Sequence, residues 1–245
     1  MDIIDRTTHQ LEDPAFRAAS RETYLATGLC ALPGFLTAPA LAALQAEAQS
    51  LAPQAYFTRT THSVYLDGAG RQEETDVGSV AYDLLPDGPL RALYADDGLR
   101  DFIGHVVGVT PIHRFADPFG ACSINVFRAG GAHGWHFDES PFTVTLMLQK
   151  PEAGGTFEYA PGLRDDAPAI EALQEGRRDG VVELPFAEGT LLIFAGRQSI
   201  HQVTHVQGDT PRLVPVLCYA AQPGTTNSPE VREMFWGRAH PMEAL

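Results

Sequence analysis

The sequence predicts an α+β fold in which several helices precede a double-sheet barrel of short antiparallel strands. Residues 1–110 contain most of the helix signals, whereas residues 112–222 contain short alternating runs separated by glycine turns. Helices followed by many short strands are typical of α+β arrangements, and a double-sheet barrel lets such strands bury a common core. The open ends of this kind of barrel offer a concave site with an apolar interior.

The N-terminal part has clear helix signals. Asp13-Pro14 predicts a helix start because proline is favoured at the first helical position, and Thr37 predicts the cap of a second helix that runs to about Ser50. The other assignments are a short strand at 28–32, a strand at 56–66, a polar, glycine-bearing mobile loop at 68–78, and helices near 88–95 and 97–107.

The barrel strands follow from the alternation of apolar and polar residues. Two glycine pairs, Gly130-Gly131 and Gly154-Gly155, predict turns between them. The predicted strands are 123–127, 142–148, 156–159, 189–194 and 212–217. A charged insertion at about 163–178 predicts a surface helix, and a last helix is expected within 228–238. We expect the whole chain, 1–245, to form one domain, because this length suits one large domain better than two.

Composition narrows the class of partner. The net charge is -14, with 31 acidic against 17 basic residues. This argues against nucleic acid and an anionic membrane surface as partners, because both require clustered positive charge. Three scattered cysteines, Cys30, Cys122 and Cys218, predict reduced thiols, and the acidic N-terminus lacks an apolar signal core. We therefore expect a cytoplasmic protein that acts on a small-molecule substrate. A homodimer is compatible with the sequence.

The feature that bears most on function is the run from His133 to Glu139. It places His136 and Asp138 two residues apart, so that in a strand both side chains point to the same side. A third ligand can come from another strand that folds back beside the first, and His201 lies in such a segment. Two histidines and one carboxylate on one face of an ion form the facial triad of non-haem Fe(II) sites.

The third ligand has two candidates on the residues alone. His205 lies four residues after His201 and has the same strand parity, so parity does not separate them. A His-x-Asp pair by itself is also a weak signal, because nine histidines and many acids produce one by chance. The strand context on both sides of the pair strengthens the hypothesis of a metal site.

These residues resemble the Fe(II)/2-oxoglutarate-dependent oxygenases. The resemblance rests on His136-Phe137-Asp138, His201 and Arg212, in this order, and covers about residues 110–222. The segments 133–138, 142–149 and 151–159 are similar to a bacterial subgroup of hydroxylases and radical halogenases that act on free amino acids. The resemblance implies a double-stranded β-helix core (jelly-roll, cupin-like), with Fe(II), 2-oxoglutarate and O2 as cofactor and cosubstrates.

The resemblance also implies roles for single residues. His136, Asp138 and His201 would bind Fe(II); the family pattern His-x-Val, with an arginine ten or eleven residues later, favours His201 over His205. Arg212 would pair with the distal carboxylate of 2-oxoglutarate, because a guanidinium matches a carboxylate bidentately.

The chain departs from one common form of the family pattern. Val214 stands where a serine or threonine often follows the arginine, so a second hydrogen bond to the cosubstrate must come from elsewhere. Thr143 and Thr145 share one face of their strand and are candidates, and Asn125 could reach the metal-bound end. Halogenases of the subgroup lack the carboxylate that Asp138 supplies here, so the resemblance implies a hydroxylase.

Several residues are candidates for binding the substrate. His133 and Glu139 could receive a substrate amine, although Glu139 could equally be a solvated acid at the rim. Trp236 could close over the site or pack in the core. Arg59, His62 and Arg71 lie in or near the segment before the barrel, where a loop could hold a substrate carboxylate, but most surface arginines have no such role.

The preferred function is the hydroxylation of a small polar metabolite, a free amino acid or a derivative. Two alternatives remain open: a hydroxylase that acts on a protein or peptide side chain, and a non-catalytic metal-binding jelly-roll. Arg212 separates the last alternative from the oxygenases, because a protein that only stores or senses metal needs no buried arginine near the ion.

Overall fold

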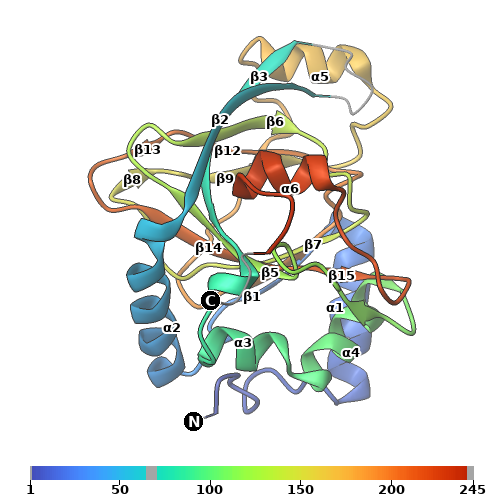
Figure 1. Ribbon diagram of the computed structural model, residues 1–245. Coiled ribbons are helices and arrows are strands. Elements are labelled where there is room, and N and C mark those ends of the chain that lie inside the picture. The colour runs from blue at the N-terminus through green and yellow to red at the C-terminus, as the bar shows by residue number, and fades with distance from the viewer. Residues whose placement is uncertain (1, 65–70, 242–245) are drawn as a thin grey trace.

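A computed structural model describes residues 2–64 and 71–241 (Figure 1). The helices are α1 (Pro14–Thr27), α2 (Ala38–Leu51), α3 (Pro89–Tyr94), α4 (Asp97–Val107), α5 (Ala167–Gln174) and α6 (Pro229–Trp236). The strands before the metal-site motif are β1 (Leu29–Leu32), β2 (Tyr56–Ser63), β3 (Gln72–Val80), β4 (His113–Arg114) and β5 (Cys122–Phe127). The later strands are β6 (Ala132–His136), β7 (Thr143–Leu146), β8 (Ala153–Gly154), β9 (Phe157–Ala160), β10 (Val182–Glu183), β11 (Leu191–Phe194), β12 (Ile200–Val203), β13 (Val206–Gln207), β14 (Arg212–Leu217) and β15 (Tyr219–Ala220).

The predicted helix starts are confirmed by their caps. The Asp13 side chain accepts a hydrogen bond from the Phe16 amide, and the Thr37 hydroxyl accepts one from the Ala40 amide. Each cap satisfies an N–H group that has no partner inside its helix, and each helix then has proline in its first turn. These local signals explain why the helix boundaries could be predicted closely.

The barrel is one curled antiparallel sheet of 11 strands. Its order is β1-β11-β7-β14-β5-β3-β6-β12-β9-β10, with β2 paired to β3 outside this path. One half of the sheet therefore contains β11, β7, β14 and β5, and the other contains β6, β12, β9 and β10. This arrangement confirms the predicted α+β fold with a double-stranded β-helix core, and α1 to α4 cover one side of it in Figure 1.

The prediction of a mobile loop at 68–78 is wrong for residues 72–78. Residues 72–80 form β3, which pairs with β2 along its length, with β6 through Thr75 and Asp76, and with β5 from Gly78 onward. β3 thus joins the two halves of the sheet. Its glycine serves close packing, because a Cβ atom at 78 would lie 2.6 Å from the Phe57 ring. Residues 68–70 of that prediction lie outside the described residues.

The two strands expected in the N-terminal part are present. β1 and β2 correspond to the strands predicted at 28–32 and 56–66. β1 extends the barrel sheet by pairing with β11, a partner far along the chain that local sequence signals do not reveal. One domain over 1–245 stays a prediction.

Two apolar layers lie on opposite faces of the sheet. The larger layer packs helix residues such as Leu44, Leu90 and Phe102 against strand residues such as Ile124 and Leu213. The inner layer is largely aromatic and includes Phe127, Phe157, Phe186 and Phe194. The inner layer borders the polar site described below.

The inserted helix α5 and the last helix α6 each cover a separate apolar cluster. α5 contributes Ile170 and Leu173 to a cluster with Trp135 and Phe137, the residues on either side of His136. α6 lies against β2, where the Thr58 hydroxyl donates to the Met234 carbonyl, and it is held by Asp117 through Arg232 at 2.8 Å. Both predicted helices are therefore present, and each supports a strand near the site.

Two further expectations concern the whole chain. Cys30, Cys122 and Cys218 are free thiols, as predicted. Among the described residues, no helix has the length and apolar character needed to cross a bilayer.

Candidate metal centre

His136, Asp138 and His201 meet where β6 and β12 lie side by side. His136 and His201 are direct register partners in these antiparallel strands. Asp138 follows the end of β6, and its Oδ1 atom lies 3.5 Å from the Nε2 atom of each histidine. Two atoms that each bind an ion at about 2.0–2.2 Å can lie this far apart. The three side chains therefore have the spacing that a small metal ion requires.

The hydrogen bonds of the two histidines fix the ring nitrogen that is free. His136 Nδ1 lies 2.8 Å from the Gly134 carbonyl, and His201 Nδ1 lies 2.9 Å from the Ser199 carbonyl. A carbonyl only accepts, so each Nδ1 carries the proton and each Nε2 presents its lone pair towards Asp138. A backbone carbonyl behind the ring is the usual support of a metal-binding histidine.

Electrostatics favour the same protonation states. Burial opposes ionisation of Asp138, but its electrostatic interactions with His201 and His136 hold the pKa of this carboxyl well below its usual range. Burial, followed by the electrostatic interaction with His201, lowers the pKa of His136. At neutral pH the group thus offers an ionised carboxylate and a neutral His136 imidazole, which are the forms that bind metal.

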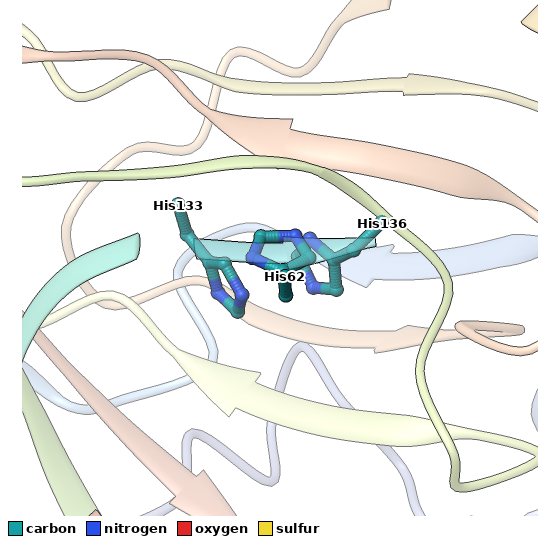
Figure 2. Close-up of side chains that lie close together, drawn as sticks. All are labelled: His62, His133 and His136. Atoms are coloured by element: carbon teal, nitrogen blue, oxygen red, sulfur yellow. The ribbon is translucent and has the colours of Figure 1, made fainter. Parts of the chain in front are cut away.

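A second histidine group shares His136 with the first. His62, His133 and His136 lie close together, as Figure 2 shows. The rings of His133 and His136 are stacked, with centroids 3.7 Å apart and an interplanar angle of 13°. Lone pairs lie in the ring planes, so stacked rings direct them along parallel planes and not towards one ion. The His136, Asp138 and His201 group is therefore the better metal site.

Arg212 lies buried in the inner aromatic layer at the start of β14. Its guanidinium carbon lies 5.3 Å from the Phe127 ring centroid and 5.9 Å from that of Phe186. Burial lowers the pKa of Arg212 to about 9, and its Nε atom has no hydrogen-bond partner. A buried cation without a partner is costly, and a carboxylate would offset that cost. This side chain fits the distal carboxylate of 2-oxoglutarate.

A family model described as Halogenase D matches residues 12–236. The chain belongs to the halogenase D family. No curated protein matches the chain in sequence. The matched residues include all six helices and the curled sheet, which is nearly the whole described part of the chain.

Solved structures share its fold. The nogalamycin epimerase SnoN, a non-haem α-ketoglutarate-dependent enzyme, superposes with a TM-score of 0.62 at 19% identity, over 85% of this chain and 84% of SnoN. EctD from S. alaskensis, with 2-oxoglutarate and 5-hydroxyectoine, gives 0.57 at 19%, over 82% and 75%. A prolyl hydroxylase from Trichoplax adhaerens gives 0.54 at 13%, over 82% and 88%. The halogenase D family member thus has the fold of Fe(II)/2-oxoglutarate oxygenases.

The candidates for a second hydrogen bond to the cosubstrate are placed differently from one another. The Thr143 hydroxyl donates to Asp138 Oδ2 at 2.5 Å, so it is already engaged at the metal group. Thr145 is half-buried on the same strand. Asn125 accepts a hydrogen bond from the Ser79 hydroxyl at 3.1 Å, which leaves its amide N–H groups to donate. Thr145 and Asn125 stay predictions, and Thr143 has another role.

The predicted substrate residues fall into two groups. His62 and His133 lie beside His136, with ring centroids 5.6 and 3.7 Å from that of His136. His62 Nε2 is buried without a hydrogen-bond partner, while its Nδ1 lies 2.9 Å from the Thr75 hydroxyl. Of the predicted substrate residues, these two imidazoles contact the metal group directly.

The remaining candidates lie at the surface or in the core. Glu139 is exposed, and its carbonyl accepts a hydrogen bond from Arg197 at 2.9 Å. Arg71 is exposed and donates to the Gln174 carbonyl of α5 at 3.2 Å, and Arg59 pairs with Glu74. Trp236 is buried against Phe119, with ring centroids 6.0 Å apart. This is the core packing that we considered as the alternative to a role at the site.

His205, the rival third ligand, is exposed, and its carbonyl accepts from the Gly155 amide. Sequence reasoning missed Gly196, whose carbonyl accepts the Asp138 amide at 3.0 Å. Its only signal in the sequence is a glycine that follows a buried strand, which by itself predicts no more than a turn.

Proposed function

We propose that this protein is an Fe(II)- and 2-oxoglutarate-dependent oxygenase that hydroxylates a small polar metabolite, a free amino acid or a derivative. His136, Asp138 and His201 would hold the iron, and Arg212 would hold the distal carboxylate of 2-oxoglutarate. When bound, iron, 2-oxoglutarate and O2 supply the oxidising chemistry, in which 2-oxoglutarate becomes succinate and CO2 and one oxygen atom enters a C–H bond.

The chain's own residues position these partners. The Gly134 and Ser199 carbonyls orient the two imidazoles, and the aromatic layer around Arg212 keeps water from its guanidinium. A dry surrounding strengthens the pairing of this cation with a carboxylate. Thr145 and Asn125 are proposed to add hydrogen bonds to the cosubstrate. The buried, partnerless Arg212 supports an oxygenase over a protein that only binds metal.

Hydroxylation is preferred to chlorination for one reason. The Asp138 carboxylate faces both histidines, so it would take the coordination position that a halide would need. The family is described as Halogenase D, so the presence of this carboxylate is the observation on which the choice depends.

Substrate binding is proposed to involve His62 and His133 next to the metal group. Glu139, Arg71 and Trp236 stay proposed substrate residues. SnoN in complex with Fe3+, α-ketoglutarate and a nogalamycin compound, and EctD with 5-hydroxyectoine, show that the fold accommodates small molecules. The net charge of -14 supports the further proposal that the protein does not act on nucleic acid.

In the decisive experiment, the protein is loaded with Fe(II) and 2-oxoglutarate without oxygen and mixed with each of a panel of free amino acids. Air is then admitted to start the reaction. Succinate formation and product masses are measured in chloride and in chloride-free buffer. We expect substrate-dependent succinate and a product heavier by one oxygen atom in both buffers. A chlorinated main product would contradict hydroxylation, and the absence of substrate-dependent succinate with every amino acid would contradict the substrate class.

A further inference from the structure

We propose that Thr143 and Gly196 form a clamp that fixes the Asp138 carboxylate in its metal-facing position. The inference rests on the proposed function and deepens it, because the position that Asp138 holds decides whether the ion keeps room for a halide. Neither residue would touch the ion or the substrate, so both are positioning residues.

Asp138 needs such support because it lies outside the regular sheet. β6 ends at His136, two residues before it. Beyond that point the Asp138 amide donates to the Gly196 carbonyl at 3.0 Å, and the Glu139 carbonyl accepts from the Arg197 side chain at 2.9 Å. A side chain on such a connection is free to rotate unless other groups hold it.

Thr143 holds one of the two carboxylate oxygens. Its hydroxyl donates to Asp138 Oδ2 at 2.5 Å, whereas Oδ1 lies 3.5 Å from the Nε2 atoms of His136 and His201. By holding Oδ2, the hydroxyl fixes the rotation of the carboxylate so that the other oxygen faces the histidines. Thr143 itself is fixed at the start of β7, where it pairs with Phe194 of β11.

Gly196 leaves the space that the same carboxylate oxygen, Oδ2, occupies. A Cβ atom at this position would overlap Asp138 Oδ2 and would lie 2.7 Å from Cγ and 2.9 Å from Cβ of Asp138. Its φ angle is not in the left-handed region, so the backbone conformation does not itself require glycine. The space taken by the carboxylate explains the glycine, and any side chain here would push Asp138 away from the histidines.

Because of these two contacts, three segments of the chain together set the position of the Asp138 carboxylate. Asp138 comes from the end of β6, Thr143 from β7 and Gly196 from the turn after β11. These segments meet at the carboxylate, so a change at residue 143 or 196 should move a metal ligand without altering the ligand itself.

The test measures binding of Co(II) to the metal-free full-length protein by its visible spectrum, which reports the ligand set without turnover. The hydroxyl-deleting variant is Thr143→Val, and Thr143→Ser restores a hydroxyl. Thr190→Val is the matched control, because Thr190 is a buried threonine whose hydroxyl has no partner. To test Gly196, the variant Gly196→Ala is compared with the control Gly98→Ala on α4. A Cβ atom at residue 98 would lie no closer than 3.2 Å to any neighbouring atom.

We expect Thr143→Val to weaken Co(II) binding by roughly 10- to 100-fold, as loss of a group that orients a metal ligand typically does. Thr143→Ser should bind nearly as well as the unmodified protein, and Thr190→Val and Gly98→Ala should match it. Gly196→Ala should give the spectrum of Asp138→Ala. If Gly196→Ala does not fold, the Thr143 pair still decides the question.

Co(II) binding by Thr143→Val with unchanged affinity and spectrum would overturn the clamp. Failure of the proposed function is seen separately. If Asp138→Ala binds Co(II) as the unmodified protein does, Asp138 is not a ligand; if the metal binds but no amino acid gives succinate, the clamp stands and the proposed reaction does not.

Discussion

The metal end and the substrate end of the candidate site differ in burial and in the secondary structure that holds their residues. At the metal end, His136, His201 and Arg212 are buried on paired strands, and carbonyl groups behind both imidazoles fix their orientation. At the substrate end, Glu139 and Arg71 are exposed and lie on connections. The contrast suggests that a rigid sheet sets the reaction while exposed segments select the substrate, as is usual when binding residues lie on loops.

The largest effect is expected from removing a ligand at the rigid end. His201→Ala should abolish metal-dependent succinate formation, because it removes one of three ligand atoms, while thermal unfolding should show that the protein still folds. His205→Ala is the control: it has the same strand parity but is exposed, so activity should be retained. The reverse result, with His205 essential and His201 dispensable, would show that the ligand assignment is wrong.

A smaller but still large effect is expected at Arg212. Arg212→Ala should raise the 2-oxoglutarate concentration needed for half-maximal rate at least about tenfold, since a hydrogen bond to a charged group is worth roughly 1.5–3 kcal/mol. Arg177→Ala, which removes an exposed arginine, should leave that concentration unchanged. An equal requirement in Arg212→Ala and the unmodified protein would remove Arg212 from the cosubstrate pocket.

The smallest effects are expected at the exposed end. Glu139→Gln should raise the KM for an amino acid substrate by only about two- to fivefold, because a solvent-exposed ion pair is worth roughly 0.2–1 kcal/mol. His133→Ala, next to the metal group, should have a larger effect on the same KM. A large effect of Glu139→Gln with little effect of His133→Ala would contradict the proposed division of the site.

Local patterns account for what the sequence predicted well. Asp13 and Thr37 cap their helices because capping depends on residues a few positions apart. His136 and Asp138 could be paired because two residues of spacing place them near each other in extended backbone. Arg212 was proposed as a buried partner for an anion from its place after the second histidine, and it is buried without a partner at Nε.

What the sequence missed depends on contacts between distant segments. β3 was taken for a loop because it is polar and bears a glycine, yet its pairing with β5 and β6 joins residues about fifty positions apart and completes the sheet. The choice between His201 and His205 was open on parity and is separated by burial, since one lies opposite His136 and the other is exposed.

The sequence by itself determined the chemical types at the site, its helix boundaries and most of its strands, because these follow from residue identity and short-range periodicity. Only the tertiary structure brought the Thr143 hydroxyl into hydrogen-bonding distance of Asp138, and placed Gly196 where this carboxylate occupies the space of a Cβ atom. The physical reason is that hydrogen bonding and steric exclusion act over a few ångströms, whereas the residues that meet here are brought together by strand pairing over long stretches of chain.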